Sequence, residues 1–522
     1  MSKFSNVFVG LMIIAFGVQH SAGQENAEPD SALRAILEKL PGATLTLQQA
    51  QGSAIENATS LHRADAVLQG ADAVVRRESG YFDPQLFFSL NYTDQKLPTA
   101  SFFSGAPVLS TQQTTTQTGL SMNLPTGTEL QLSLNTTRLG TNSTFAFLNP
   151  EFDAFGMLTL RQPLLGGFMV SARKRLRQAE MQSEGEKNRY DQQVLGVRSD
   201  VEQLYWDLYS AERDYAVETL SRNRAAAFLN ETELRAKAGL VGPDQVANAR
   251  TFLAQQEILL LDREESLDQV SDRLAVLIGN RPSGQAARFR TVDDPPVGGP
   301  VGPVDSLVRL ATENNLDLRA AQRDIDAATA LSDAARWEAL PSVDLVGSLG
   351  GSGLGGRTQD VIFGTDTLRI AAAPGFSDAF NQVYHRDFPN WSLGVQVTFP
   401  IGLRSGMAEK DRLDADVVGA QQSLIEKSRL LEQQVRAVCR DLERGRHRLD
   451  VVREGVAAAQ EQVRIGIIEF RNGRTTAFEL VRLGEDLAVA EQRYYQERVR
   501  TAKAAAALHA LTSGSYQGGG TL

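Results

Sequence analysis

The stretch Leu158-Thr-Leu-Arg-Gln-Pro-Leu-Leu-Gly-Gly-Phe168 begins like a β-strand and then contains a proline and two glycines. Residues 171–239, which follow it, contain no proline and many polar side chains. The same change recurs at Val397-Thr-Phe-Pro-Ile-Gly-Leu-Arg-Ser-Gly-Met407, with no proline beyond it. Proline cannot donate to a β-ladder, and glycine lets the backbone turn sharply. Each stretch therefore predicts a strand that ends and is followed by a long helix. The residues of these two transitions are Pro163, Gly166, Gly167, Pro400 and Gly402.

The two proline-free segments have the pattern of long coiled-coil helices. Apolar residues recur in alternating steps of four and three, for example at Val201, Leu204 and Leu208. Each helix would be roughly 100 Å long at 1.5 Å per residue, so the helices must pack side by side. Asp441-Leu442 lies 234 residues after Asp207-Leu208, and many other positions match at this spacing. The chain is therefore predicted to be a tandem duplication.

Composition and the N-terminus restrict the classes of function. A net charge of −10 argues against nucleic-acid binding, and one cysteine with five scattered histidines offers no metal site. We expect no cofactor and no enzymatic activity. The apolar run Val7–Val18, followed by Ser21-Ala-Gly23, is typical of a cleaved secretory signal peptide. No other window offers the roughly twenty apolar residues of a membrane-spanning helix.

Segments ahead of each long helix alternate apolar and polar residues, as Leu130, Leu132 and Leu134 do. This alternation suits a transmembrane barrel with a wet interior, and it suits a soluble sandwich equally well. The first half has four such segments, near 85–93, 118–124, 129–137 and 156–162. The polar or glycine-rich segments Ser101–Gln117 and Gly350–Pro389 are predicted to be exposed loops.

These patterns predict the following organisation. The signal peptide occupies 1–23, the first repeat 24–283, a Pro/Gly-rich linker 284–303, the second repeat 304–514 and a tail 515–522. Each repeat starts with a helical stretch. The first then has strands over 85–164, a long helix over 168–238 and a short helix over 244–279; the second has strands over 342–400, a long helix over 404–470 and a short helix over 476–513.

Taken together, the chain resembles the TolC-like outer-membrane efflux protein family over roughly residues 43–514. The resemblance is carried by Leu160-Arg-Gln-Pro-Leu-Leu165, by Thr398-Phe-Pro-Ile-Gly402, by two reversing tips and by the closing Ala507-Leu-His-Ala-Leu-Thr-Ser-Gly514. It implies an α+β membrane protein whose duplicated strand pairs form a trimeric β-barrel, while very long antiparallel helices form a periplasmic α-barrel. The family usually has two strands in each half, so the four segments of the first half are a departure.

The function implied by this resemblance is that of an outer-membrane channel-tunnel for efflux or type I secretion. The implied partners are two further copies of the chain, outer-membrane lipid, a periplasmic adaptor protein and an inner-membrane pump of the RND, ABC or MFS type. The chain itself would be a passive duct from the periplasm to the exterior. The implied location is the outer membrane of a Gram-negative cell.

The resemblance also indicates candidate site residues. In the family, acidic residues past the second tip narrow the periplasmic aperture, with a tyrosine and an arginine in the closing network. Here Glu479 takes the first acidic position, whereas Arg482 replaces the second, Phe470 replaces the tyrosine, and Arg474 lies beside the arginine position. Glu479 and Arg482 equally fit an ordinary surface pair one helical turn apart. The candidate adaptor contacts at the tips are Gly239, Leu240, Gly242, Gly473 and Arg474.

Three other interpretations compete with these. Gly351-Ser-Gly-Leu-Gly-Gly356 matches a dinucleotide-binding pattern, but no helical period follows it, which favours a flexible loop. Tyr205, Trp206 and Tyr209 could line a ligand cage, although helix packing explains them more simply. A trimeric outer-membrane adhesin or stalk would also use heptads and a barrel, without needing two reversing tips.

Overall fold

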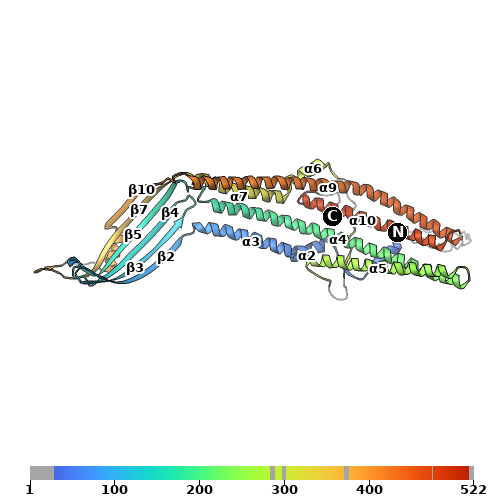
Figure 1. Cartoon of the computed structure of the whole chain (residues 1–522), viewed down its shortest axis with the longest axis horizontal. Coiled ribbons are helices and arrows are strands. Elements are labelled where there is room, and N and C mark those ends of the chain that lie inside the picture. The colour runs from blue at the N-terminus through green and yellow to red at the C-terminus, as the bar shows by residue number, and fades with distance from the viewer. Residues whose placement is uncertain (1–28, 283–287, 297–300, 370–374, 473, 517–522) are drawn as a thin grey trace, which may run out of the picture.

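The computed structural model describes residues 29–282, 288–296, 301–369, 375–472 and 474–516. The molecule is elongated, with a β-sheet at one end and two helical hairpin tips at the other (Figure 1). The predicted signal peptide lies outside the described residues. Within them, no helix is long and apolar enough to cross a membrane.

A six-stranded antiparallel sheet forms one end of the molecule, in the order β10-β7-β5-β4-β3-β2. The neighbours β5 and β7 come from different repeats, so the sheet joins the two halves of the chain. Its strands are β2 (Gln85–Pro98), β3 (Val108–Asn123), β4 (Glu129–Thr141), β5 (Leu148–Leu165), β7 (Ser342–Thr358) and β10 (Phe388–Thr398).

Three expectations about the sheet were wrong. Residues 108–117 belong to β3 and not to a loop, because they pair with both β2 and β4. The glycine-rich motif at 351–356 lies inside β7, where it pairs with β5. The segment beyond it forms β8 (Val361–Phe363), β9 (Asp366–Leu368) and α8 (Phe376–His385).

The glycines of that motif have a steric reason. Helix α8 packs against β7, and a Cβ at Gly353 would overlap the carbonyl oxygen of Ala379 in α8. A Cβ at Gly351 would lie 3.1 Å from the carbonyl oxygen of Val383. The glycine pattern therefore marks close approach of a helix backbone to a strand, and not a phosphate-binding loop.

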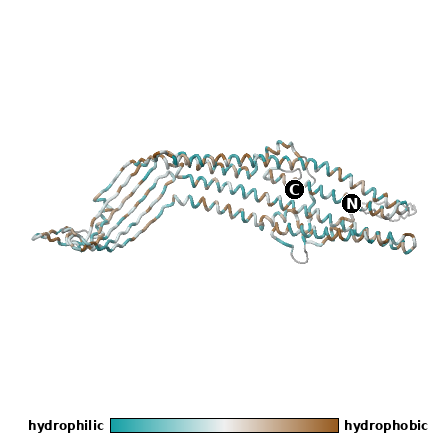
Figure 2. Tube along the Cα trace, in the orientation of Figure 1, coloured by the Kyte–Doolittle hydropathy of each residue, from teal (hydrophilic) through white to brown (hydrophobic). Residues whose placement is uncertain are grey.

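The first repeat contributes α2 (Leu47–Asn57), α3 (Thr59–Ser79), α4 (Lys174–Lys237) and α5 (Pro243–Ile278), preceded by α1 (Pro29–Lys39). The second contributes α6 (Val304–Asn314), α7 (Leu316–Glu338), α9 (Arg404–Arg471) and α10 (Ala477–Leu511). Helix α4 begins six residues later than expected, since residues 168–173 form turns. The long helices α4 and α9 run from the sheet to the tips, whereas the shorter helices each cover part of that length (Figure 1). Along the helices and strands, hydrophobic and hydrophilic residues alternate without long apolar runs (Figure 2).

The shorter helices meet end to end. Asn315, the N-cap of α7, donates from its amide to the carbonyl oxygen of Leu511 at the end of α10, at 3.2 Å. At the equivalent place in the first repeat, Gly279 ends α5 with φ +68° against Asn57, the last residue of α2. A Cβ at Gly279 would lie 2.6 Å from the Cβ of Asn57. Both repeats therefore build a nearly continuous second helix from two pieces.

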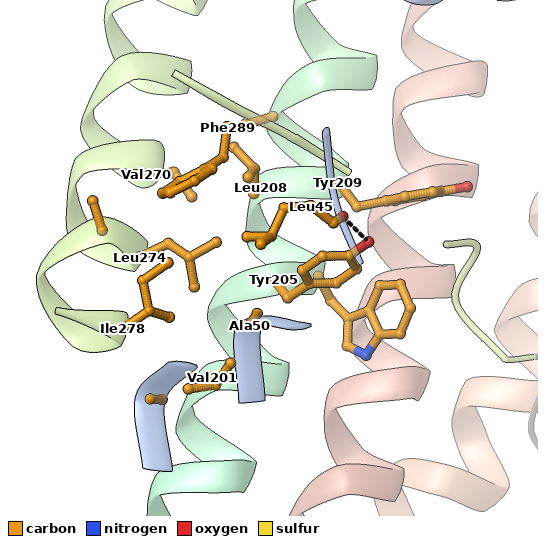
Figure 3. Packing of buried hydrophobic residues seen from close by; sticks show 14 of the residues in the cluster. Leu45, Ala50, Val201, Tyr205, Leu208, Tyr209, Val270, Leu274, Ile278 and Phe289 are labelled. Atoms are coloured by element: carbon orange, nitrogen blue, oxygen red, sulfur yellow. Dashed lines mark hydrogen bonds between the residues drawn. The ribbon is translucent and has the colours of Figure 1, made fainter. Parts of the chain in front are cut away.

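The best-packed part of the helical region is a belt around the middle of α4 (Figure 3). Tyr205, Trp206 and Tyr209 are almost fully buried there, as packing rather than a ligand cage would require. Tyr205 donates its hydroxyl to the carbonyl oxygen of Leu45, at 2.9 Å. The strands β1 (Ala43–Leu45) and β6 (Phe289–Thr291) pair beside it. The rest of the belt, defined here with those three aromatics, includes Ala50, Val201, Leu208, Leu267, Val270, Leu274, Ile278 and Phe289.

Part of the expected linker is held in this belt. Residues 291–294 bind α4, because Glu212 accepts from the backbone N–H of Thr291 at 2.7 Å and from its hydroxyl at 2.5 Å. Tyr209 donates to the carboxylate of Asp294 at 2.7 Å. The chain between the repeats is thus a structural element as well as a connection.

The transition from sheet to helix differs in detail from the expectation. Pro163 does not end its strand, since β5 continues to Leu165 through a register shift. The turn comes at Gly166 (φ +66°) and Gly167 (φ +131°), where glycine tolerates the backbone conformation. In the second repeat β10 ends at Thr398 before Pro400, and Gly402 (φ +93°) and Leu403 (φ +51°) make the turn.

Candidate functional site

The two helical tips have the same backbone design. At the first tip the N–H of Leu240 donates to the carbonyl oxygen of Arg235, and at the second the N–H of Arg474 donates to that of Glu469, both at 2.9 Å. These bonds close the C-termini of α4 and α9 in the manner of a Schellman motif. Gly239 (φ +73°) supplies the left-handed residue at the first tip. Gly473, its counterpart by position, lies outside the described residues.

The helices leaving the tips start differently. Helix α5 starts with Pro243 at its first turn after Gly242, without a side-chain cap. Helix α10 starts after Thr476, whose hydroxyl accepts from the N–H of Glu479 at 3.3 Å. Leu240 is 74% exposed, so the first tip presents an apolar side chain to solvent.

Phe470 connects the two hairpins. Its ring lies 4.5 Å from the guanidinium carbon of Arg235 in the last turn of α4. A guanidinium over an aromatic face is attracted by the ring, by about 0.5–1 kcal/mol at an exposed site. The hydroxyl that a tyrosine would have at this position is therefore not needed for a contact between the hairpins.

A cleft of about 270 Å³ lies between the two hairpins, lined by residues of α4, α5, α9 and α10. Its apolar lining includes Phe228, Phe252, Ile467 and Leu480, and Arg224, Glu231 and Glu485 also line it. Phe470, a predicted aperture residue, also lines this cleft. Sequence reasoning missed Arg235 and the part of the lining that α4 and α5 contribute, because the apolar seam was followed in α4 only as far as Tyr215. The aromatic residues Phe228, Phe252 and Phe470, close to the tips, were the available signal.

Glu479 and Arg482 form the expected pair. The guanidinium of Arg482 lies 3.3 Å from the Glu479 carboxylate, and both side chains are substantially exposed. Neither lines the cleft, to which α10 presents Leu480, Val481, Gly484 and Glu485. Within one chain these two residues are therefore a surface ion pair, and the structure does not join them to Phe470.

A layer of buried charge separates the tips from the belt. Burial raises the pKa values of Asp214 and Glu218 on α4, while the neighbouring Arg263 lowers them. Burial also raises the pKa of Glu485 on α10, whose carboxylate accepts from Gln256 at 3.5 Å. Buried polar networks with incomplete hydrogen bonding hold neighbouring helices less firmly than apolar packing does. Leu33, Ala216, Val217 and Ala488 form a small apolar cluster at this level, so fewer buried apolar side chains join the hairpins here than join the helices in the belt.

The carboxylates near the tips are not arranged as a metal site. Over the parts of the chain that the structure describes, no three His, Cys, Asp or Glu side chains are grouped to hold a metal ion. The arrangement consists of a six-stranded sheet, long helices packed side by side and two tips.

Comparison with known proteins supports this class. Residues 307–514 match the family model described as outer membrane efflux protein. No curated protein sequence matches the chain. Among solved structures, the CmeC outer membrane channel of Campylobacter jejuni is similar at a TM-score of 0.65 and 13% identity, covering 91% of this chain and 87% of that chain.

Two further solved structures are also similar to this chain. The outer membrane protein VceC of Vibrio cholerae is similar at a TM-score of 0.62 and 15% identity, covering 90% of this chain and 97% of that one. The MtrE outer membrane channel of Neisseria gonorrhoeae is similar at 0.62 and 17% identity, covering 90% and 89%. The chain therefore shares the fold of these three proteins. Together with the match of residues 307–514 to the family model, this confirms the predicted resemblance to the TolC-like outer-membrane efflux proteins.

Proposed function

We propose that the protein is the outer-membrane duct of a tripartite export system. The observation that carries the proposal is the combination, in one chain, of a sheet with an apolar cross-strand row on one face and a polar row on the other, and helices that continue from the sheet to two tips. A sheet with these two faces suits lipid on one side and a wet lumen on the other. The duct is passive, and its partners supply the energy.

In this proposal three copies assemble, with their sheets closed into one barrel in the outer membrane of a Gram-negative cell. Their helices extend into the periplasm. The equivalent tips at Leu240 and Arg474 and the two end-to-end helix joints support a division of the chain into two repeats. The signal peptide at 1–23 directs the chain out of the cytoplasm.

The tips are the partner-binding end. Gly239, Leu240, Gly242, Gly473 and Arg474 contact a periplasmic adaptor, which in turn binds an inner-membrane pump of the RND, ABC or MFS type. Phe470, Arg474, Glu479 and Arg482 surround the aperture. A ring of Glu479 from three copies would attract cations, and Arg482 one turn away would offset much of that charge.

Solute release from proteoliposomes tests the proposal. Purified protein is reconstituted into vesicles loaded with sugars of graded size, and release is followed after dilution. We expect release that needs no nucleotide and no gradient of ions, and that stops above a size limit. Vesicles that contain correctly folded trimer and retain every sugar would favour the adhesin or stalk, which has no lumen.

A further inference from the structure

The hairpin formed by β3 and β4 is the part of the sheet that the family resemblance does not explain. It lies between β2 and β5, and it pairs along nearly its whole length with both of them. Strands of 16 and 13 residues are long enough to cross a bilayer, which takes about 9–11 tilted residues. The hairpin is therefore as tall as the rest of the sheet.

The turn of this hairpin is fixed at the base of the sheet. The N–H of Met169 donates to the carbonyl oxygen of Thr126 at 3.3 Å, and a Cβ at Gly127 would lie 2.6 Å from the carbonyl oxygen of Gly167. Thr128 donates to the side chain of Gln162 on β5. The turn is thus built into the transition between sheet and helix, and not left as a free surface loop.

Close to this turn, ion pairs connect the β3–β4 hairpin to β5, and β5 to β7. Arg161 on β5 lies 3.2 Å from the carboxylate of Glu129 on β4 and 3.0 Å from that of Asp344 on β7. Glu129 and Arg161 are directly opposite each other in the ladder. Opposite charges in this position stabilise the pairing of the two strands.

Two rows of residues continue across the hairpin from one edge of the sheet to the other. One cross-strand row is entirely apolar and includes a residue from every strand. One of the two rows adjacent to it, on the opposite face, is entirely polar and uncharged. The apolar row is Leu86, Leu120, Leu132, Leu158, Leu349 and Trp391, and the polar row is Gln85, Ser121, Gln131, Thr159, Ser348 and Ser392.

The two outer strands of the sheet lack a second neighbour. β2 and β10 each pair on one side, and nearly all their residues are exposed. Phe88 on β2 and Trp391 on β10 are 68% and 71% exposed. Long apolar edges with free backbone donors and acceptors pair with another strand unless they are protected. β2 leads away from the helices and β10 leads toward them, so two copies placed edge to edge would pair antiparallel, as every other pair in the sheet does.

We propose that the β3–β4 hairpin is part of the channel wall, and that β2 of one copy pairs with β10 of the next. Resting on the trimer of the proposed function, this places six strands from each chain and 18 strands in the closed barrel. Barrel diameter grows roughly linearly with strand number, so the bore here is about one and a half times that of a 12-stranded wall built from four strands per chain. The outer-membrane part of this duct therefore admits wider cargo than the family's usual strand number would allow.

Disulfide cross-linking between edges tests the inference. The native thiol of Cys439 is buried and is first removed by Cys439→Ala. Cysteines then replace one residue on the polar face of β2 (Ser89 or Asn91) and one on that of β10 (Asn390, Ser392 or Gln396). The control pair combines Gln131→Cys on β4 with Ser392→Cys. A second control, Ser348→Cys with Ser392→Cys, joins residues whose hydroxyl oxygens are 2.7 Å apart in one chain.

We expect at least one β2–β10 pair to yield covalent dimers and trimers on non-reducing gels, because neighbouring strands hold same-face residues at disulfide distance. The β4–β10 pair stays monomeric, and the Ser348–Ser392 pair closes within one chain. Electron cryomicroscopy of the same material then shows 18 strands.

Two results overturn the inference in distinguishable ways. Intermolecular cross-links from β4–β10 and from no β2–β10 pair, in material that still releases sugars, would make β4 the edge strand of the wall. They would place β2 and β3 outside the wall and leave the duct intact. Monomeric material that releases no sugar would remove the duct itself, and the 18-stranded barrel with it.

Discussion

The belt and the tips are built on the same helices but are held in different ways. In the belt, α4 packs against α2, α5, β1 and β6 through large buried side chains whose polar atoms are hydrogen bonded. At the tips, the two hairpins meet through one cation–π contact and a partly apolar cleft. We therefore expect the belt to contribute most of the free energy of folding. We expect the two tips to separate with only a small loss of free energy. A duct whose aperture at the tips can widen needs this division.

The largest expected effect comes from opening a cavity in the belt. Leu208 is fully buried, so Leu208→Ala should lower the free energy of unfolding by about 2–5 kcal/mol. The matched change at the tip, Leu240→Ala, should stay within about 0.5 kcal/mol because that side chain is exposed. Thermal unfolding followed by helical circular dichroism measures both. Equal effects from the two variants would remove the contrast between the regions.

The belt should also be sensitive to pH through Glu212. Burial raises the pKa of its carboxyl to about 7, although the hydrogen bonds from Thr291 lower it. The folded chain therefore keeps a proton that the unfolded chain has lost, and this stabilisation is present below the ordinary pKa of 4.5 and disappears as the pH rises through about 7. Between about pH 4.5 and pH 7 the free energy of unfolding should therefore fall by roughly 3 kcal/mol.

Glu212→Gln keeps the acceptor for the N–H of Thr291 and cannot ionise. Unfolding free energies measured at intervals from about pH 4 to pH 8 should fall less steeply for this variant than for the wild-type chain. A residual slope is expected from Asp214 and Glu218, because burial raises the pKa of each in the same direction. Parallel curves for the two proteins would show that Glu212 is not the source.

At the tips, removing the contact between the hairpins should cost little stability. Arg235→Ala should lower the unfolding free energy by about 0.5–1 kcal/mol, and Arg235→Lys should retain part of the attraction to the Phe470 ring. Protease sensitivity of the tips reports the change more directly than global unfolding, because local opening exposes the turns. A loss as large as that of Leu208→Ala would make the tips part of the stable core.

The smallest effect is expected at the surface pair. Glu479→Gln should change stability by about 0.2–0.5 kcal/mol, since an exposed pair one turn apart contributes no more than this. Its effect on ion selectivity should be the larger one if three copies of Glu479 form a ring. Reversal potentials, measured with different salt concentrations on the two sides of a bilayer, report the selectivity between cations and anions. Glu479→Gln should lower the preference for cations, and Arg482→Gln should raise it.

The sequence predicted the elements well where one physical signal dominated. Heptad spacing at Val201, Leu204 and Leu208 indicated the long helices, and the change after Gly166 indicated where the strand ends. Its failures came where contact between distant segments decides the structure. The glycines at 351–356 suggested a loop because the helix that requires them, α8, lies some 25 residues further along. Pro163 suggested a strand end, but a register shift against β7 absorbs it.

The candidate site was harder to predict for the same reason. Glu479 and Arg482 are close in sequence, and their pairing could be expected from helical spacing alone. Phe470 and Arg235 are on different repeats, so no local pattern brings them together. The cleft between the hairpins depends on the lateral packing of α4, α5, α9 and α10, which periodicity does not specify.

Single-channel recording in planar bilayers tests the central claim most directly, namely that this chain forms a passive duct that is narrowed at its tips. Wild-type trimer is compared with an Arg235→Ala, Phe470→Ala double variant and with the neutral tip variant Leu240→Ala. The account predicts discrete conductance steps for all three, with larger steps or longer openings for the double variant alone. Correctly folded trimer that conducts no current in any of them would contradict it.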